Sequence, residues 1–433
     1  MSSDQTAALK KVLKPIHLWA IAVGLVISGE YFGWNYGWGV SGTIGFLVAT
    51  VVVTIMYVTF IFSFTELTTS IPQAGGPFAY SHRAFGWWGG LIAGYATLVE
   101  FLITPPAIAF ALGSYTHFLY PSIPILYTAF ACYVIFIGIN LLGIKESATF
   151  SLVVTLLAVV ELLVYIGIVA PHFSYETFVK EPMPFGWQGV FAALPFAIWF
   201  YLAIEGVAMV AEEVENPKKT ISLGYIYGIL TLVILAMAVM IFTGGVAHWS
   251  VLSSIDYPLP AALGIVLGRD SGLTHLFASL GLFGLIASFH GTIIGYSRQI
   301  FALARSGFLP SFLGKVNPRF QTPHWALFAG GLIGCIALCL GTTDQVIILA
   351  ALGAVVMYII SMAALFVLRK KEPELERPFT VPLFPYFPAI ALVISIICLI
   401  SIVYYNPVLS LWFFGILLFM FIAFIVSGKY KNL

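Results

Sequence analysis

Long apolar segments, joined by short polar ones, follow one another along almost the whole chain. A helix needs about 20 mostly apolar residues to cross a bilayer, and the sequence contains twelve segments of this kind. They cover residues 17–40, 42–68, 86–113, 122–142, 149–170, 188–212, 221–246, 273–303, 324–342, 345–368, 383–403 and 407–428. The pattern predicts an all-α membrane protein with twelve transmembrane helices and little chain outside the bilayer.

The charges agree with this arrangement and give it an orientation. Only 9% of the residues are charged, whereas a soluble domain has about 25%. When the N-terminus is placed in the cytoplasm, every Lys and Arg except Lys180 and Arg269 falls on the cytoplasmic side, as the positive-inside rule requires. We expect a multi-pass protein of the cytoplasmic membrane with both termini cytoplasmic. The net charge of +1 leaves no basic face, which excludes a nucleic-acid-binding protein.

Residue types that carry catalysis or bind metals do not form a recognisable site. The four cysteines lie in apolar segments, where we interpret them as small packing residues. The sequence lacks the H-E-x-x-H pattern of zinc proteases and the G-x-S-x-G pattern of serine hydrolases. We therefore expect no enzyme, no catalytic residue, no cofactor and no bound metal.

A few titratable side chains lie in or near the predicted spans, where they are costly. An acid at the middle of the bilayer costs about 2.5–3.5 kcal/mol, so several in one chain indicate a wet cavity or specific partners. We interpret Glu66, near the end of the second span, as a packing or interfacial residue. The candidates for proton transfer are Glu100, Glu161, Glu205 and His290.

Two of the acids lie where the helix itself is weak. Three glycines within ten residues surround Glu30 in the first span, and Pro195 and Gly206 flank Glu205 in the sixth. The first and sixth spans are corresponding members of two halves of five spans each. Paired interruptions of this kind are typical of the substrate site of a transporter.

Five sequence motifs, in order and at the expected depths, resemble the amino acid–polyamine–organocation superfamily of secondary transporters. They are Gly24 to Phe32, Glu66-Leu67 with Pro72 to Tyr80, Gly143 to Ala148, Glu205 with Glu212 to Lys219, and Arg298 to Pro310. The resemblance implies an inverted repeat of five helices, 17–170 and 188–368, with two peripheral helices at 383–428. A cytoplasmic segment, 1–16, and a cytoplasmic tail, 429–433, complete the expected organisation. The resemblance also implies alternating access to a site between the broken first and sixth spans.

The first span departs from the superfamily pattern at one informative position. Members usually carry Gly, a small hydroxyl residue and Gly there, and the free N–H groups of that segment receive a substrate carboxylate. This chain has Ser28, Gly29 and Glu30 at the three positions. Two anions about 4 Å apart repel by several kcal/mol in a partly desolvated cavity. The departure argues for a small amine without a carboxylate.

The stretch from Ile27 to Trp34 most closely resembles the ethanolamine permease branch. That resemblance implies transport of ethanolamine or a similar small primary amine, with its ammonium paired to Glu30 and covered by Trp199, which matches the aromatic that closes over substrates in relatives. Neighbouring aromatic rings add about 0.5–2 kcal/mol when they face a cation. The candidate substrate-binding residues are Ile27, Ser28, Gly29, Glu30, Tyr31, Trp199, Tyr201, Ala203 and Glu205.

Several alternatives stay open from the sequence. Glu30 could instead cap the second half of the broken helix, and the chain could be an amino-acid permease or exchanger of the same fold. Proton-coupled relatives carry a lysine in the fifth span, where this chain has Ala158. A lysine-based coupling mechanism is therefore in doubt, and protons as coupling ion, uniport and exchange are all open. The expected partners are the bilayer and a small amine; the sequence predicts no oligomeric state.

Overall fold

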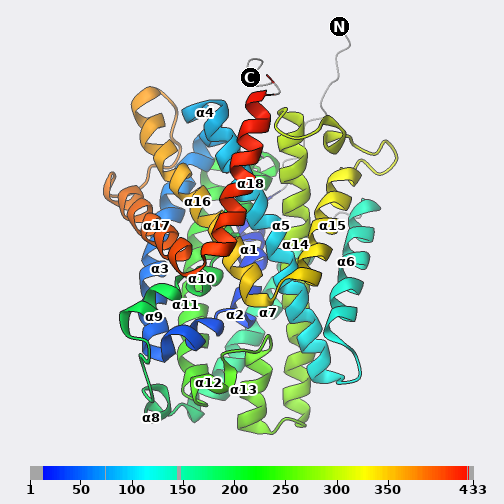
Figure 1. The fold of residues 1–433 in the computed structure, drawn as a ribbon, viewed down its shortest axis with the longest axis vertical. Helices are drawn as coiled ribbons and strands as arrows, with labels where there is room; N and C mark the ends of the chain where they lie inside the picture. The colour runs from blue at the N-terminus through cyan, green and yellow to red at the C-terminus, as the bar shows by residue number, and fades with distance from the viewer. Residues whose placement is uncertain (1–12, 74, 144–147, 427, 429–433) are drawn as a thin grey trace.

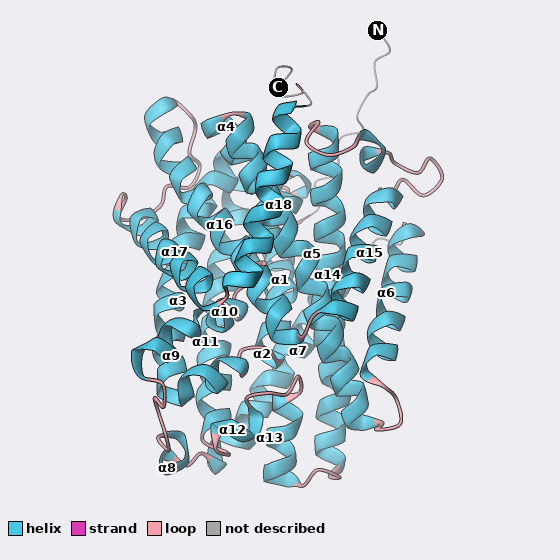
Figure 2. Cartoon of the chain, in the orientation of Figure 1, coloured by secondary structure: helices cyan, strands magenta, loops and turns pink. Residues whose placement is uncertain are grey.

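The computed structural model describes residues 13–73, 75–143, 148–426 and 428, and they are almost entirely helical (Figure 2). The α-helices are α1 Pro15–Val26, α2 Ser28–Tyr31, α3 Tyr36–Ser70, α4 Pro77–Phe85, α5 Trp87–Leu119, α6 Ile125–Leu141, α7 Ala148–Val169, α8 Tyr175–Phe178, α9 Gly186–Ala192, α10 Leu194–Trp199, α11 Pro217–Gly244, α12 Trp249–Leu252, α13 Pro258–Leu267, α14 Gly272–Arg305, α15 His324–Leu340, α16 Thr343–Lys371, α17 Tyr386–Tyr405 and α18 Pro407–Val426. Short 3₁₀ helices are η1 Ala170–His172, η2 Ile204–Glu213 and η3 Ser311–Gly314. The predicted cytoplasmic tail and most of the predicted N-terminal segment lie outside the described residues.

Nine segments within the described residues are long and apolar enough to cross a membrane: α3, α5, α7 with η1, α9 through η2, α11, α14, α16, α17 and α18. The other three predicted spans coincide with the shorter apolar helices α1, α6 and α15. Helix α1 is short because the first predicted span is interrupted. Helices α6 and α15 have 17 residues each, about 25 Å of helix against a hydrocarbon core of about 30 Å.

The boundary predicted between the first and second spans, at residues 40–42, lies inside α3. Gly42 interrupts the helical backbone there with φ of 71°. This is the left-handed region, which glycine enters without a steric penalty. A Cβ atom at this position would also lie 2.6 Å from Cδ of Pro184. The chain therefore needs glycine at this boundary for two reasons.

Helix α5 forms the centre of the bundle, and α17 and α18 lie at its edge (Figure 1). Helix α5 continues through Pro105 and Pro106 and packs against α14 and α16. Gly353 allows α16 to approach the backbone of α5 closely, because a Cβ there would lie 2.7 Å from the carbonyl oxygen of Ala96 and 2.9 Å from the amide nitrogen of Glu100. The mid-membrane part of α5 is therefore held against α16 by direct backbone contact.

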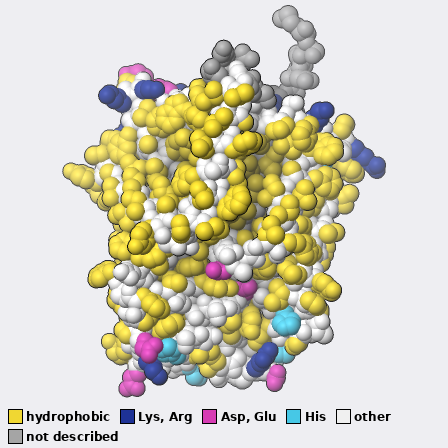
Figure 3. All heavy atoms as spheres, viewed as in Figure 1, with side chains coloured by type: hydrophobic (Ala, Val, Ile, Leu, Met, Phe, Trp, Pro, Cys, Tyr) yellow, Lys and Arg dark blue, Asp and Glu magenta, His cyan; other side chains and the backbone are white. Residues whose placement is uncertain are grey.

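Hydrophobic side chains cover most of the face shown in Figure 3, and the Lys and Arg side chains visible there lie towards its two ends. The C-terminal end of α18 lies at the same end of the bundle as α4 (Figure 1). This distribution is that of a protein surrounded by lipid at its waist and by water at its ends.

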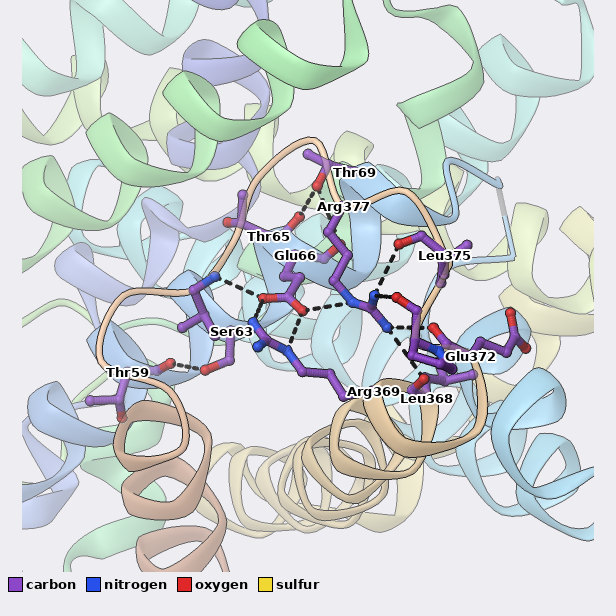
Figure 4. Close-up of polar contacts among 12 residues, drawn as sticks. Thr59, Ser63, Thr65, Glu66, Thr69, Leu368, Arg369, Glu372, Leu375 and Arg377 are labelled. Atoms are coloured by element: carbon purple, nitrogen blue, oxygen red, sulfur yellow. Dashed lines mark hydrogen bonds and ion pairs between the residues drawn. The ribbon is translucent and has the colours of Figure 1, made fainter.

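Near the end of the bundle that carries α4, an ion-pair network surrounds Glu66 of α3 (Figure 4). Its side chain is 1% exposed. Arg369 donates two hydrogen bonds to it, of 2.8 and 2.6 Å, and Arg377 forms an ion pair of 3.3 Å. The N–H of Val381 donates a further bond of 2.8 Å. Glu66 is thus a packing residue that joins α3 to the end of α16 and the following linker.

At the opposite end, Asp256 joins four parts of the chain. Its carboxylate accepts hydrogen bonds from Tyr36 at 2.7 Å, Thr343 at 2.9 Å and Ser114 at 3.5 Å. Asp256 itself lies in the loop between α12 and α13. Burial raises the pKa of Asp256 above its usual value, and the hydroxyl donors lower it in part. The loop is therefore tied to α3, α5 and α16 over this end of the bundle.

Candidate functional site

The first predicted span is broken at Ile27, between α1 and α2. The hydroxyl of Ser288 of α14 is inserted at this point: it donates to the carbonyl of Gly24 at 2.7 Å and accepts from the N–H of Ser28 at 3.1 Å. A continuous helix would join that N–H and that carbonyl directly. The N–H of Ser28, expected from the resemblance to receive a substrate carboxylate, is thus occupied by Ser288.

A second interruption follows α2, before α3 begins at Tyr36. Gly33 has a φ of 91°, and its N–H donates to the side-chain oxygen of Asn35 at 3.0 Å. The indole N–H of Trp34 donates to the carbonyl of Glu30 at 3.1 Å. The short helix that carries Glu30 is therefore separated from its neighbours at both ends.

The sixth predicted span is also interrupted in its middle. Helix α10 ends at Trp199, and the 3₁₀ helix η2 begins at Ile204. Between them Ala203 has a φ of 77°, a left-handed conformation that a residue with a Cβ adopts rarely. Its N–H donates to Glu100 Oε1 of α5 at 3.2 Å. This hydrogen bond compensates part of the backbone strain and holds the break against the centre of the bundle.

The two breaks are in direct contact. A Cβ at Gly29 would lie 2.5 Å from the carbonyl oxygen of Trp199, so only glycine allows this approach. The indole N–H of Trp199 donates to the carbonyl of Phe32 at 2.9 Å, and the two rings meet edge to face at 5.5 Å. Residues far apart in the sequence, which glycine and proline marked as weak points, thus form one site.

Glu30 is the unusual member of this site. Its side chain is 0% exposed, and within the described residues neither carboxylate oxygen has a hydrogen-bond partner. The alternative in which this carboxylate caps free N–H groups is therefore wrong for this conformation. Tyr201 lies close enough to interact with Glu30 electrostatically. A buried carboxylate without donors or a cation carries a large desolvation penalty, so this position is suited to a positively charged guest.

Tyr31 and Glu161 pair with each other. The Tyr31 hydroxyl donates to Glu161 Oε2 at 2.8 Å and contacts the carbonyl of Ala158 at 3.3 Å. Tyr115 donates in turn to the carbonyl of Tyr31 at 3.2 Å. The hydroxyl of Tyr31 is thus directed to α7, and Ala158, the position of the lysine in proton-coupled relatives, lies directly beside α2.

Tyr201 and Glu205 belong to a second group of polar side chains. The Tyr201 hydroxyl shares a hydrogen bond of 2.7 Å with Thr54 of α3. The Tyr358 hydroxyl donates to Glu205 Oε2 at 3.4 Å and shares a bond of 2.7 Å with Tyr57. Glu205 lies against Glu100. The structure therefore brings together two of the predicted proton-transfer candidates, from the third and sixth spans.

His290 lies elsewhere. Its ring packs at 5.5 Å from Phe136 of α6. Ser288, two positions earlier on α14, faces the first break, and residues two apart on a helix do not share a face. The ring of His290 thus lies against α6, on another side of α14 than Ser288.

Sequence reasoning missed the residues that bind these predicted positions together. They are Ser288, Thr54, Tyr57, Tyr115 and Tyr358. Serine, threonine and tyrosine are common in transmembrane helices and carry no charge penalty that would draw attention to them. The available signal was weaker: Ser288 lies two residues before His290, and Tyr57 and Tyr358 lie inside otherwise apolar segments.

A bundle of apolar helices with two contacting helix breaks, and a buried acid beside them, is typical of a membrane transporter. The chain matches the amino acid permease family over residues 13–427. It belongs to that family, and so to the superfamily that the motifs indicate.

Individual relatives carry different substrates in their names. An uncharacterized transporter of Rhizobium meliloti is 30% identical over 90% of this chain and 85% of its own length. A branched-chain amino acid permease of Bacillus subtilis is 25% identical over 98% of this chain and 95% of its own. A methylthioribose transporter of the same organism is 28% identical over 90% and 88%. The family is therefore fixed, and the substrate differs among relatives of similar identity.

Proposed function

We propose that this protein is a secondary transporter for a small primary amine without a carboxylate, with ethanolamine as the specific candidate. The observation that carries the proposal is the carboxylate of Glu30, fully buried beside two helix breaks without a hydrogen-bond donor. An ammonium group at this position would supply both the charge and the donors that the carboxylate lacks. Trp199 would cover the amine from the sixth span.

The surroundings of Glu30 also favour a substrate without an acid group. The N–H of Ser28 is occupied by Ser288 at 3.1 Å, and Gly29 lies against the carbonyl of Trp199. A carboxylate entering here would meet a carbonyl oxygen and a second anion. The hydroxyl of ethanolamine, by contrast, is able to donate to such a carbonyl.

The second candidate is transport or exchange of a small neutral amino acid. Similarity to a branched-chain amino acid permease over 98% of this chain favours it. An amino acid bound here would need its carboxylate on N–H groups of the first break, which requires that the bond between Ser28 and Ser288 opens. The amino-acid candidate therefore requires that the hydrogen bond between Ser28 and Ser288 opens, and the amine candidate does not.

We infer that the working topology has twelve crossings, with α1 to α2, α6 and α15 completing the nine longer segments. Residues 17–170 and 188–368 would form the two inverted repeats, and α17 and α18 the periphery. The end that carries α4 and the Glu66 network would face the cytoplasm in a cytoplasmic membrane, because most Lys and Arg lie on the loops of that side. The core would then move between outward-open and inward-open states around the two breaks.

The test is uptake of radiolabelled ethanolamine by the purified protein in liposomes, for the native chain and for Glu30→Gln. We expect saturable uptake that excess ethanolamine inhibits and that alanine or leucine does not. Glu30→Gln should lower the uptake efficiency at least about 30-fold, because truncating one partner of a buried charge pair costs about 2–5 kcal/mol. Glu374→Gln, which removes an exposed carboxylate, is the matched control.

Two results would contradict the proposal. Uptake by Glu30→Gln at the native rate would remove Glu30 as the ligand of the ammonium. Inhibition by leucine or alanine, together with uptake of the labelled amino acid, would favour the second candidate instead.

A further inference from the structure

Two fully buried carboxyl groups lie at the break of the sixth span, one from α5 and one from η2. Glu100 and Glu205 are both 0% exposed and lie against each other. Glu100 accepts a hydrogen bond of 3.2 Å from the N–H of Ala203, two residues before Glu205. They come from different predicted spans and lie more than one hundred residues apart in the sequence. Only the packing of α5 against the interrupted sixth span brings them together.

Each carboxyl group has a donor on one oxygen only. Glu100 Oε1 accepts from the N–H of Ala203 at 3.2 Å, and Glu205 Oε2 accepts from the Tyr358 hydroxyl at 3.4 Å. Within the described residues, Glu100 Oε2 and Glu205 Oε1 are buried without a hydrogen-bond partner. An ionised carboxylate only accepts hydrogen bonds, so a bond between two carboxyl groups requires that one of them carries a proton. A single shared proton supplies the missing donor.

Within the described residues, the groups that contact the pair carry no positive charge to replace that proton. Tyr358 of α16 contacts Glu205, Tyr57 of α3 bonds to Tyr358, and Tyr225 of α11 donates to the carbonyl of Glu205 at 3.2 Å. From α14, Arg298 bonds to η2 at its far end, at the carbonyl of Met209 and the carboxylate of Glu213. Cys398 of α17 lies near Tyr57. The recorded neighbours of the pair are therefore phenols and backbone groups.

We propose that Glu100 and Glu205 together bind one proton, and that this proton is the coupling ion of the amine transport proposed above. The coupling role rests on the proposed amine transport, and the shared proton does not. Both partners act on the broken sixth span: Glu100 holds Ala203 by its N–H, and Glu205 is part of η2. Loss of the shared proton leaves two adjacent negative charges, which drives η2 away from α5. Protonation is thereby linked to the position of the segment that carries Trp199.

Isosteric glutamine variants separate proton binding from folding. Glu100→Gln and Glu205→Gln each keep an acceptor oxygen for the existing donor and add an NH₂ group that replaces the shared proton. Native protein and variants are reconstituted in liposomes with a pH gradient of one unit, acidic outside, at zero membrane potential. One coupled proton sustains about tenfold accumulation of ethanolamine under these conditions. We expect the native protein to approach this ratio and both variants to fall to a ratio of about one.

Counterflow of labelled against unlabelled ethanolamine shows whether the variants still fold and cycle, and Glu374→Gln controls for loss of a carboxylate elsewhere. Counterflow with no gradient-driven accumulation in Glu100→Gln, whose carboxyl group is not among the candidate substrate ligands, supports the proposal. Accumulation by both variants to the native ratio overturns it. Accumulation by the native protein that ignores the pH gradient overturns the coupling role and leaves the proposed amine transport intact.

Infrared spectroscopy tests the proton site without any transport. At neutral pH, the spectrum of the native protein minus that of the double variant Glu100→Gln/Glu205→Gln should contain the C=O stretch of a protonated carboxyl, shifted in heavy water. Absence of that band overturns the shared proton. If the native protein moves no ethanolamine, the proposed function fails, and this measurement still decides whether the pair binds a proton.

Discussion

Glu66 and Glu30 are both almost completely buried, and their surroundings are opposite. Glu66, near the end of the bundle that carries α4, accepts hydrogen bonds from Arg369 and from the N–H of Val381 and lies 3.3 Å from Arg377 (Figure 4). Glu30, beside the helix breaks, has no donor on either oxygen within the described residues. The same buried side chain thus occurs with full compensation at one place and none at the other.

The difference separates an acid that its surroundings satisfy from one that they do not. A fully compensated carboxylate fixes the geometry of its partners and leaves no capacity for a ligand. An uncompensated one lowers the stability of the protein and would gain most from a cation. Burial alone therefore does not separate the two kinds of acid, and their hydrogen-bond partners do.

The largest effect that we expect from this comparison is on stability at Glu66. Glu66→Ala leaves Arg369 and Arg377 without their common anion, and removing one partner of a buried ion pair costs about 3–5 kcal/mol. The apparent melting temperature in detergent should fall steeply, together with the yield of folded protein. Melting at the native temperature would show that the network contributes little. The melting temperature of Glu66→Gln, which keeps the shape of the side chain, should lie between those of Glu66→Ala and the native protein.

At Glu30 the expected effect on stability has the opposite sign. Glu30→Gln removes a buried charge that has no partner, so stability should stay at the native value or rise by at most about 1–3 kcal/mol. Ethanolamine at about 100 times its Kd should stabilise the native protein by about 2.7 kcal/mol and leave the variant unchanged. Melting curves with and without ethanolamine measure both effects. A strong loss of stability in Glu30→Gln would mean that this carboxylate has structural partners.

How far the sequence predicted these two sites depended on the kind of signal. The apolar segments placed most of the helices, because crossing a bilayer requires a fixed length of apolar chain. The breaks were visible because glycine and proline weaken a helix wherever they occur: α1 ends within three residues of Gly24, and α10 follows Pro195 closely. Glu30 was noticed because a charge in an apolar segment is rare.

What the sequence left out depends on packing between distant segments. The contact between Glu100 and Glu205 requires that α5 meets the interrupted sixth span, and the insertion of Ser288 into the first break requires a particular rotation of α14. The hydrogen bond from the Tyr31 hydroxyl to Glu161 depends in the same way on how α7 packs against α2. Neither apolar pattern nor composition specifies such rotations.

The smallest effect that we expect is on stability, at an exposed ion pair. Arg83 and Glu372 pair at 2.6 Å near the Glu66 network, but their side chains are 41% and 32% exposed. Water and salt screen such a pair, so Glu372→Gln should cost no more than about 1 kcal/mol at pH 7. The comparison with Glu66→Ala tests whether burial, rather than geometry, determines the contribution of an ion pair in this protein.

The pH dependence of this small effect has a definite sign. The hydrogen bond from Arg83 holds the pKa of Glu372 below its ordinary value of 4.5. A carboxyl whose pKa is lower in the folded state contributes stability above the pKa of the unfolded chain and loses it as the pH falls through the folded value. The difference in melting temperature between native protein and Glu372→Gln should therefore be present at neutral pH and close below about pH 4.5. A difference that persists in acid, or in molar salt, would show that the side chain acts through packing instead of charge.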